Sequence, residues 1–307
     1  MKNLSSNKIP VIAVVGPTAS GKSEFAVRLA EKYNGEIVSA DSIQIYKQMN
    51  IGSAKPSKEE MKGIPHYLLG FLDISEEFSV ADYVNLARTY IKDIYSRNKL
   101  PIICGGTGLY INSLIDNVQF EESNIDKSLR EKLNKKAEIE GIESLLAELK
   151  EFDAESYNRL AGTNNARRII RAIEIYRTTG ITMTEQIKNS KNLPSPYDAK
   201  LIGLNFSNRS DLYTRINNRV DKMVEKGLVH EAEEILKMPY SRTSMGAIGY
   251  KEFIPYFNGK LSLDCCIEKI KINTRHYAKR QITWFKRDER IKWILQNGNE
   301  DLLSYFA

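Results

Sequence analysis

Short apolar runs alternate with amphipathic stretches over most of the chain. The runs are typical of buried strands, and the stretches that follow them repeat apolar residues at helical spacing. Ser79, for example, comes directly before such a stretch and is a preferred N-cap residue. The strand-like runs are residues 11–15, 35–39, 100–104, 200–205 and 290–295. Strands that alternate with helices predict an α/β fold in which helices flank a parallel sheet.

The pattern changes in the middle of the chain. Residues 121–195 are helical and charged without an apolar strand run, which predicts a mainly helical insertion domain in a core domain of residues 1–120 and 196–307. Predicted helices cover 126–149 and 153–176 in the insertion and 211–226, 229–237 and 265–286 in the core, an exit loop covers 192–198, and irregular segments cover 47–77 and 244–251. A long loop such as 47–77 is often a lid or part of a substrate cleft.

A phosphate-binding pattern follows the first strand. The sequence GPTASGKS, residues 16–23, fits G-x-x-x-x-G-K-[ST] and precedes a helical stretch. Gly16 and Gly21 allow backbone N–H groups to turn toward an anion, and the helix that begins near Gly21 adds its positive dipole end. Lys22 adds a mobile charge, and the Ser23 hydroxyl suits Mg²⁺. The predicted diphosphate- or nucleotide-binding residues are Gly16, Pro17, Thr18, Ala19, Ser20, Gly21, Lys22 and Ser23. A Gly-rich turn that binds nothing is the alternative.

Polar residues also follow two other predicted strands. Because the carboxyl ends of parallel strands meet at one edge of a sheet, these residues are expected near the bound phosphates. Asp41 could act as a base or hold magnesium, and the amide of Gln44 suits an adenine edge. An Asx turn that only shapes the chain is the alternative at Asp41. The sequence GGTGLY, which starts at Gly105, supplies backbone donors and the hydroxyl of Thr107.

The chain leans basic, with a net charge of +6 and a pI near 8.9, which permits a polyanionic partner. Arg167 and Arg171 lie one helical turn apart, with isoleucines beside them facing inward. A solvated helix face is the alternative there. Residues 275–287 mix cations with aromatics, as binding of single-stranded nucleic acid requires. The alternative is a basic helix end that Trp284 and Phe285 dock on the core.

Composition excludes several classes of protein. The three cysteines have no C-x-x-C spacing, so neither a disulfide framework nor a zinc site is indicated. The first ten residues lack the apolar core of a signal peptide, and no stretch approaches the ~18 apolar residues of a membrane span. We therefore expect a soluble, cytoplasmic protein.

Taken together and in order, the motifs resemble the tRNA dimethylallyltransferase family, also called tRNA isopentenyltransferases. They are GPTASGKS, DSIQIY, IGSAKP, GIPHYL, SVADY, GGTGLY, NARRIIRAIEIY, GYKE and TRHYAKRQITWF. The resemblance covers residues 11 to about 287 and implies a P-loop NTPase-like core. It also implies Mg²⁺-dependent transfer of a dimethylallyl group from dimethylallyl diphosphate to N6 of the adenosine 3′ of the tRNA anticodon. The chain ends at Ala307 without the C-terminal zinc finger of eukaryotic members, so a bacterial type is expected.

The resemblance also implies roles for individual residues. Asp41 is the expected general base, Thr107 lies beside the reacting centre, Lys22 acts on the diphosphate, and Ser23 is the Mg²⁺ ligand. The predicted tRNA-binding residues are Asp41, Ser42, Ile43, Gln44, Thr107, Arg130, Arg167, Arg168, Arg171, Gly249, Tyr250, Lys251, Lys279, Arg280, Gln281, Thr283 and Trp284. The expected partners are the anticodon stem-loop of tRNA and dimethylallyl diphosphate, with no membrane, and we expect a monomer.

Two other functions share these features. A nucleoside or small-metabolite kinase would use the same phosphate loop to bind a nucleoside triphosphate such as ATP and would transfer phosphoryl instead of alkyl groups. A non-enzymatic RNA-binding module would use the loop as a nucleotide-dependent switch. The kinase predicts a phosphorylated acceptor, whereas the module predicts RNA affinity without covalent change.

Overall fold

The computed structural model describes residues 8–120, 127–190 and 192–296. The chain forms two compact units, which we call the core unit (Met1–Ile115 and Ser195–Ala307) and the insertion unit (Asp116–Pro194). The insertion predicted from the sequence covers residues 121–195. Residues 1–7, which belong to the opening segment considered for a signal peptide, and Asp126, the expected start of a helix, lie outside the described residues.

A parallel sheet forms the centre of the core unit, as the sequence predicts. Within the described residues it has six strands in the order β3-β2-β4-β1-β5-β6. The strands are β1 (Ile9–Val15), β2 (Gly35–Ser39), β3 (His66–Tyr67), β4 (Leu100–Gly105), β5 (Tyr197–Phe206) and β6 (Ile291–Gln296), all paired in parallel. Five of them were predicted. The short strand β3 was not, because the segment 47–77 that contains it lacks a strand-like run.

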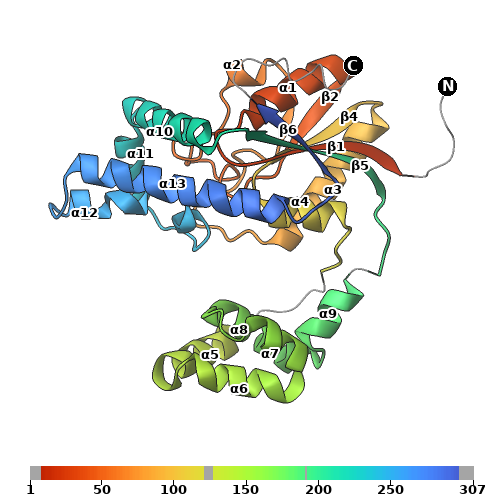
Figure 1. Ribbon diagram of the computed structural model, residues 1–307, viewed down its shortest axis with the longest axis vertical. Helices are drawn as coiled ribbons and strands as arrows, with labels where there is room; N and C mark the ends of the chain where they lie inside the picture. Colours follow the sequence, from red (N-terminus) through yellow and green to blue (C-terminus); the bar gives the residue numbers. More distant parts are fainter. Residues whose placement is uncertain (1–7, 121–126, 191, 297–307) are drawn as a thin grey trace. The chain divides into compact units, whose positions relative to one another are not determined.

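Helices cover both faces of the sheet (Figure 1). In the core unit they are α1 (Lys22–Tyr33), α2 (Lys58–Met61), α3 (Val80–Ser96), α4 (Gly108–Ile115), α10 (Arg209–Glu225), α11 (Leu228–Lys237), α12 (Ile254–Phe257) and α13 (Leu263–Phe285), with short 3₁₀ turns at Ser244–Gly246 and Lys251–Phe253. Along β1, Val11 and Ala13 face the layer of α3 and α4, whereas Ile12 and Val14 face α1. Burial on both faces explains why the strands are continuous apolar runs.

The N-terminus of α3 follows the sequence prediction. Ser79 Oγ accepts the N–H of Asp82 at 3.2 Å, and Asp82 Oδ2 accepts the N–H of Ser79 at 2.8 Å. This reciprocal capping box satisfies two N–H groups that the first turn of a helix leaves free. The long helix predicted over 265–286 is also present as α13, which packs beside α10.

Five short helices, and not two long ones, form the described part of the insertion unit. They are α5 (Lys127–Glu140), α6 (Ile142–Phe152), α7 (Ala154–Leu160), α8 (Ala166–Thr179) and α9 (Met183–Asn189). The predictions of single helices over 126–149 and 153–176 are therefore wrong. Gly141, with φ +83°, interrupts the first, and Asn165 starts α8 by accepting the N–H of Arg168. The isoleucines of α8 are buried, as predicted.

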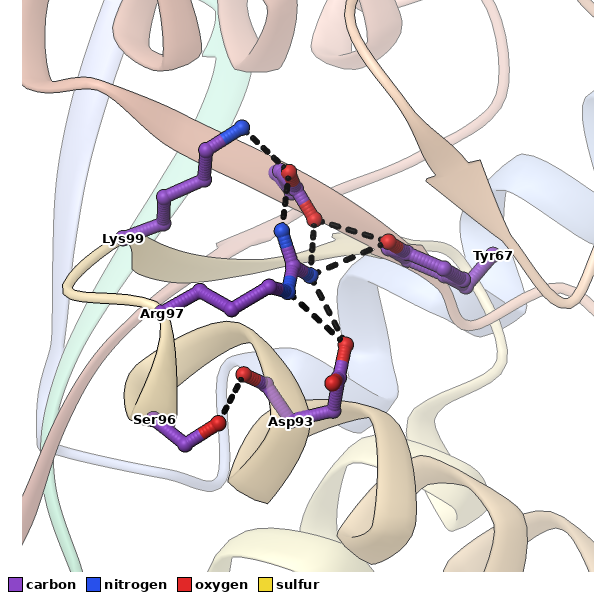
Figure 2. A network of polar contacts seen from close by, with 6 residues as sticks. Tyr67, Asp93, Ser96, Arg97 and Lys99 are labelled. Carbon is purple, nitrogen blue, oxygen red and sulfur yellow. Dashed lines mark hydrogen bonds and ion pairs between the residues drawn. The ribbon is translucent and has the colours of Figure 1, made fainter.

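A polar network ties together the amino-terminal ends of β2 and β4. Glu36 on β2 is 1% exposed, and its carboxylate accepts two hydrogen bonds from Arg97 at 2.8 and 2.6 Å and one from Lys99 at 2.6 Å. Tyr67 donates to it at 2.8 Å, and Arg97 also pairs with Asp93, as Figure 2 shows. Hydrogen bonds from Arg97, followed by those from Lys99 and Tyr67, outweigh burial and lower the pKa of Glu36 to about 2.

No helix in the described ranges combines the length and the apolar character that crossing a bilayer would require.

Candidate active site

A cleft of about 370 Å³ lies where β1, β2 and β4 end. It brings together residues that the sequence predicts for different roles, from the phosphate loop, from the segment after β2 and from α13. The predicted site residues among its lining are Thr18, Lys22, Ser23, Asp41, Ser42, Ile43, Gln44, Gly249, Arg280 and Gln281. Three distant parts of the core unit therefore meet at one edge of the sheet, where ligands bind in such folds.

The phosphate loop has the strand–loop–helix context that its pattern requires. Gly16, with φ +140°, ends β1, and Gly21, with φ +84°, is the N-cap of α1. A Cβ on Gly16 would lie 2.3 Å from the carbonyl oxygen of Leu204, so the loop can follow this path only with glycine there. The positive end of α1 consequently faces the cleft.

Lys22 lies half-buried and folds back on the loop. Its Nζ donates to the carbonyl of Pro17 at 2.6 Å. Burial removes water from the ammonium group and is the main reason that the pKa of Lys22 is lowered to about 8. The nearby Cys104 and Asp41 raise this pKa but do not cancel the effect of burial. The ammonium group loses part of its hydration free energy in the cleft, and an anionic ligand would compensate for that loss.

Asp41 forms the turn that the sequence left as an alternative. Its Oδ1 accepts the N–H groups of Ile43 at 2.9 Å and Gln44 at 3.3 Å. The turn does not exclude a chemical role, because Oδ2 accepts no hydrogen bond from the described residues. Asp41 thus fixes one oxygen in the turn and leaves the second one available to a ligand in the cleft.

Thr107 joins the end of β4 to the segment after β2. Its Oγ1 accepts the N–H of Ser42 at 3.1 Å and lies 3.4 Å from Ser42 Oγ. Thr107 itself is not among the lining residues of the cleft, although Gly105 and Gly106 are. Gln44 lines the cleft, and its Nε2 donates to the carbonyls of Ser53 and Ala54 at 3.2 Å each. Its amide is therefore oriented by the loop that follows.

Arg219 is a candidate that the sequence analysis missed. It lies on α10 and lines the cleft beside Lys22 and Asp41. Burial lowers its pKa, and Asp41 opposes that shift. Arg215, one turn earlier, donates from Nε to the carbonyl of Ala19 in the phosphate loop at 3.1 Å. The spacing of the two arginines was the available signal, but the helix was interpreted only as amphipathic.

A second cavity, of about 980 Å³, shares Lys22, Ser23, Arg219 and Met223 with the first. Its lining carries an excess of cations over carboxylates. The charged residues among that lining are Lys22, Glu24, Lys55, Glu60, Lys62, Arg215, Arg219, Lys222 and Lys226. The two cavities therefore adjoin at the phosphate loop, and the second one presents a basic surface.

The predicted tRNA-binding residues of α13 divide between two faces. Lys279, Arg280 and Thr283 are exposed, and the guanidinium of Arg280 lies over the ring of Tyr277 at 5.7 Å. Trp284 is half-buried and donates from Nε1 to Asn112 at 3.1 Å. Gln281 is buried. The docking interpretation therefore applies to Trp284, whereas nucleic-acid binding by the exposed residues stays a prediction.

Tyr250, Lys251 and Gly249 also differ in their surroundings. Tyr250 is completely buried, and its hydroxyl donates to Glu231 at 3.0 Å, so it packs inside the fold as the structure stands. The Glu231 carboxylate also accepts N–H groups of residues 50–52. Lys251 is exposed, and the N–H of Gly249 donates to Glu252. Among these three, Lys251 presents its side chain to solvent.

In the insertion unit, the predicted arginines also differ. Arg130 pairs with the buried carboxylate of Glu174 at 2.5 and 2.7 Å, and Arg171 lies 3.7 Å from the same group. Arg167 and Arg168 are exposed at the start of α8. Arg130 therefore has a structural partner already, whereas Arg167 and Arg168 present their charge to solvent.

The described residues contain no cluster of three or more His, Cys, Asp or Glu side chains that could hold a metal ion. A magnesium ion bound together with phosphates needs only one or two protein oxygens. The hydroxyl of Ser23 and the carboxylate of Asp41, both in the cleft, are oxygen donors of the required kind.

Comparison with known proteins gives consistent matches. A family model described as IPP transferase matches residues 44–288. The chain is 51% identical to the tRNA dimethylallyltransferase of Caldanaerobacter subterraneus subsp. tengcongensis, over 97% of this chain and 98% of the relative. It is 48% identical to the protein of the same name from Acetivibrio thermocellus, over 92% and 91% of the two chains.

Solved structures are similar as well. The full-length tRNA isopentenylpyrophosphate transferase from Bacillus halodurans is 41% identical, with a TM-score of 0.69, over 94% of this chain and 90% of that one. A eukaryotic dimethylallyltransferase described as acting on tRNA is 32% identical, with a TM-score of 0.78, over 90% of this chain and 70% of that one.

Proposed function

We propose that this chain, which belongs to the tRNA dimethylallyltransferase family and is a transferase, moves a dimethylallyl group from dimethylallyl diphosphate to N6 of the adenosine 3′ of the tRNA anticodon. A tRNA substrate implies a cytoplasmic location. The observation that carries the proposal is one cleft in which Lys22 and the phosphate loop lie beside the carboxylate of Asp41, only one oxygen of which is used by the turn. Alkyl transfer needs both an anion site and a proton acceptor.

The cations of the cleft suit the departure of diphosphate. Breaking the allylic carbon–oxygen bond leaves negative charge on the diphosphate, and preorganised positive groups stabilise that charge where it develops. Lys22, Arg219 and the N-terminus of α1 supply such groups. Ser23 would hold Mg²⁺, which when bound adds positive charge at the diphosphate oxygens.

Asp41 suits the attack by the adenine amine. That amine is a poor nucleophile, because its lone pair is delocalised into the ring. The free oxygen of Asp41 would take the N6 proton as the new carbon–nitrogen bond forms, an effect of about 10²- to 10⁴-fold. Gln44, held by the carbonyls of Ser53 and Ala54, would face the edge of the adenine. The base must leave the anticodon stack to reach this cleft.

The arrangement of the cavities supports separate routes for the two substrates. The larger basic cavity adjoins the cleft at Lys22 and Arg219. A diphosphate could enter along it, while the tRNA approaches the side where Arg280 and Lys279 of α13 are exposed. A phosphate-binding loop between two openings suits a reaction of a small donor with a macromolecular acceptor.

Mass spectrometry of tRNA tests the proposal directly. Unmodified tRNA is incubated with the protein, Mg²⁺ and dimethylallyl diphosphate, and we expect a gain of one prenyl unit beside the anticodon. The Asp41→Ala variant should lose most of this product while still binding tRNA.

Parallel reactions with labelled ATP and nucleoside acceptors test the kinase alternative, which requires a phosphorylated product. Unchanged RNA in every reaction, with RNA affinity that depends on nucleotide, would instead support the RNA-binding module.

A further inference from the structure

We infer that Gln281 is a positioning residue that locks the phosphate loop to the Gly-rich turn after β4, and that it does not contact tRNA. The inference rests on the proposed function, since it concerns the geometry of the donor site. It departs from the sequence analysis, which placed Gln281 among the tRNA-binding residues.

The hydrogen bonds of Gln281 carry the argument. Its Oε1 accepts the backbone N–H of Thr18 at 2.8 Å, and its Nε2 donates to the carbonyl of Gly106 at 3.0 Å. The side chain is 6% exposed. Both ends of the amide are thus used by backbone groups of two different loops, and water does not compete for them.

The packing around Gly106 shows how close this contact is. A Cβ on Gly106 would lie 2.1 Å from Nε2 of Gln281, so a larger residue there would displace the amide from its present position. The two partners, Thr18 and Gly106, both line the cleft. The glutamine, which lines the cleft itself, therefore joins two of its walls.

Tyr277 extends the same contact along α13. It lies one helical turn before Gln281 and lines the same cleft, where burial raises the pKa of its hydroxyl and the nearby side chains of Thr107 and Gln281 oppose that shift. Trp284, at the next turn, fixes the same face of the helix to Asn112 of α4. Thr107 in turn receives the N–H of Ser42, next to Asp41. One stripe of α13 thus sets the spacing between the phosphate loop and the segment that holds the proposed base.

Small errors in such spacing reduce catalysis strongly, because the reacting groups must lie within a few tenths of an ångström of the productive geometry. Removing a side chain that orients a group in contact with the ligand typically costs 10- to 100-fold in activity or affinity. We expect a loss in this range for Gln281→Leu, expressed in kcat/KM for dimethylallyl diphosphate.

The experiment compares full-length variants in three assays. Gln281→Leu removes both hydrogen bonds, Tyr277→Phe removes one hydroxyl, and Gln48→Leu is the matched control. Gln48 is a half-buried glutamine whose amide donates to Asp73 and which lines neither cavity. The assays are prenyl-transfer kinetics, calorimetric binding of inorganic diphosphate with Mg²⁺, and filter binding of unmodified tRNA. Circular dichroism and thermal melting establish that each variant folds.

The expected pattern separates positioning from tRNA contact. Gln281→Leu should lose about 10- to 100-fold in kcat/KM for the donor and bind diphosphate more weakly, while its tRNA affinity stays within about twofold of the wild type. Tyr277→Phe should lower kcat by about 3- to 10-fold with diphosphate affinity unchanged, because it acts on the acceptor side. Gln48→Leu should match the wild type in all three assays.

Two results would overturn the inference. One is a Gln281→Leu variant that loses tRNA affinity but keeps donor KM and diphosphate binding. The other is a Gln281→Leu variant that cannot be told apart from Gln48→Leu. If Gln281→Leu does not fold, Tyr277→Phe decides instead, and an unaltered kcat in that variant would also overturn the inference. Absence of prenyl transfer by the wild type would reject the proposed function instead, and diphosphate binding would still decide the role of Gln281.

Discussion

The two edges of the parallel sheet hold charge in opposite ways. At the amino-terminal edge, Glu36 is almost completely buried and receives hydrogen bonds from Arg97, Lys99 and Tyr67. At the carboxyl-terminal edge, Lys22 and Arg219 are partly withdrawn from water, and neither forms an ion pair with a carboxylate among the described residues.

The pKa values show what this difference means. The pKa of Glu36 is lowered to about 2 because its partners stabilise the charged carboxylate. The pKa of Lys22 is lowered to about 8 because burial destabilises the charged ammonium. Both pKa values are lowered, but for different reasons. The carboxylate of Glu36 has cationic partners, whereas the ammonium group of Lys22 has no carboxylate partner among the described residues. A carboxylate whose hydrogen bonds are satisfied by cations stabilises the fold, whereas a partly buried cation without a counter-ion is suited to binding an anionic ligand.

The largest effect is expected for Asp41 at the functional edge. Asp41→Asn keeps the shape of the side chain and one oxygen that can accept the N–H groups of Ile43 and Gln44. It removes the group proposed to accept the N6 proton, so kcat for prenyl transfer should fall by about 10²- to 10⁴-fold. Rates are measured by mass spectrometry of the tRNA product, and the melting temperature should stay within a few degrees.

The control for this variant comes from the opposite edge. Glu36→Gln is also a carboxylate-to-amide change, and below its own melting range it should turn over like the wild type. If Asp41→Asn retained near-full kcat across the pH range, Asp41 would not be the base. If Glu36→Gln lost activity while remaining folded, the division between a structural edge and a functional edge would be wrong.

Glu36→Gln should instead lower the free energy of unfolding by about 2 to 4 kcal/mol, because removing one partner of a buried ion pair typically costs about 3 to 5 kcal/mol and Arg97 keeps Asp93 as a partner. The new amide N–H₂ group would also face two cations, Arg97 and Lys99. Urea denaturation followed by circular dichroism measures the loss. A change below about 0.5 kcal/mol would mean that solvent around Arg97, which is 38% exposed, already supports its charge.

The same network predicts a response to acid. The folded-state pKa of Glu36 lies near 2 and its ordinary value near 4.5, so its contribution is complete above pH 4.5 and is lost as the pH falls toward 2. The wild type should therefore lose more unfolding free energy than Glu36→Gln over this interval. Equal acid sensitivity of the two proteins would show that the carboxylate does not gain from its partners.

The sequence predicted which residues meet at the carboxyl-terminal edge of the sheet better than it predicted the Glu36 network at the amino-terminal edge. The phosphate loop, Asp41 and Gln44 were found because local motifs follow strand ends, and a parallel sheet gathers those ends. Glu36 was missed, because a single glutamate in an apolar run carries no local sign of partners 61 and 63 residues away. The burial of Gln281 was not foreseen, since helical spacing alone does not say which stripe of α13 the core covers, and its tRNA-binding role stays a prediction.

The course of the helical insertion was also only partly predictable. Its helical character was clear from composition, whereas the breaks depend on single residues such as Gly141 and Asn165. Arg219 escaped notice because an arginine on an amphipathic helix is usually solvated. Its spacing from Arg215 puts both arginines on one side of α10, but only the packing of α10 in the core unit places that side beside Lys22.

A smaller effect is expected from deprotonation of Lys22, and it concerns the pH dependence of kcat/KM for the donor. With a pKa of about 8, Lys22 is protonated below that pH and loses its charge above it. Because diphosphate binding requires the cation, kcat/KM for the donor should fall above pH 8, approaching tenfold per pH unit. In Lys22→Arg the guanidinium stays charged, so the fall should disappear even if the overall rate is lower. A wild-type profile that stays flat to pH 10 would contradict this assignment.

The smallest effect is expected for Lys99, which donates a single hydrogen bond to Glu36. Its side chain is 33% exposed, and Arg97 remains to hold both carboxylate oxygens when Lys99 is removed. Lys99→Met keeps the aliphatic stem and should cost only about 0.5 to 1 kcal/mol of unfolding free energy, because partly exposed pairs contribute little.

Denaturation of Lys99→Met, Glu36→Gln and the double variant measures the coupling. Since the amide introduced by Glu36→Gln carries no charge for Lys99 to stabilise, Lys99→Met should cost less in that background. Purely additive losses would show that Lys99 acts through general charge and not through Glu36.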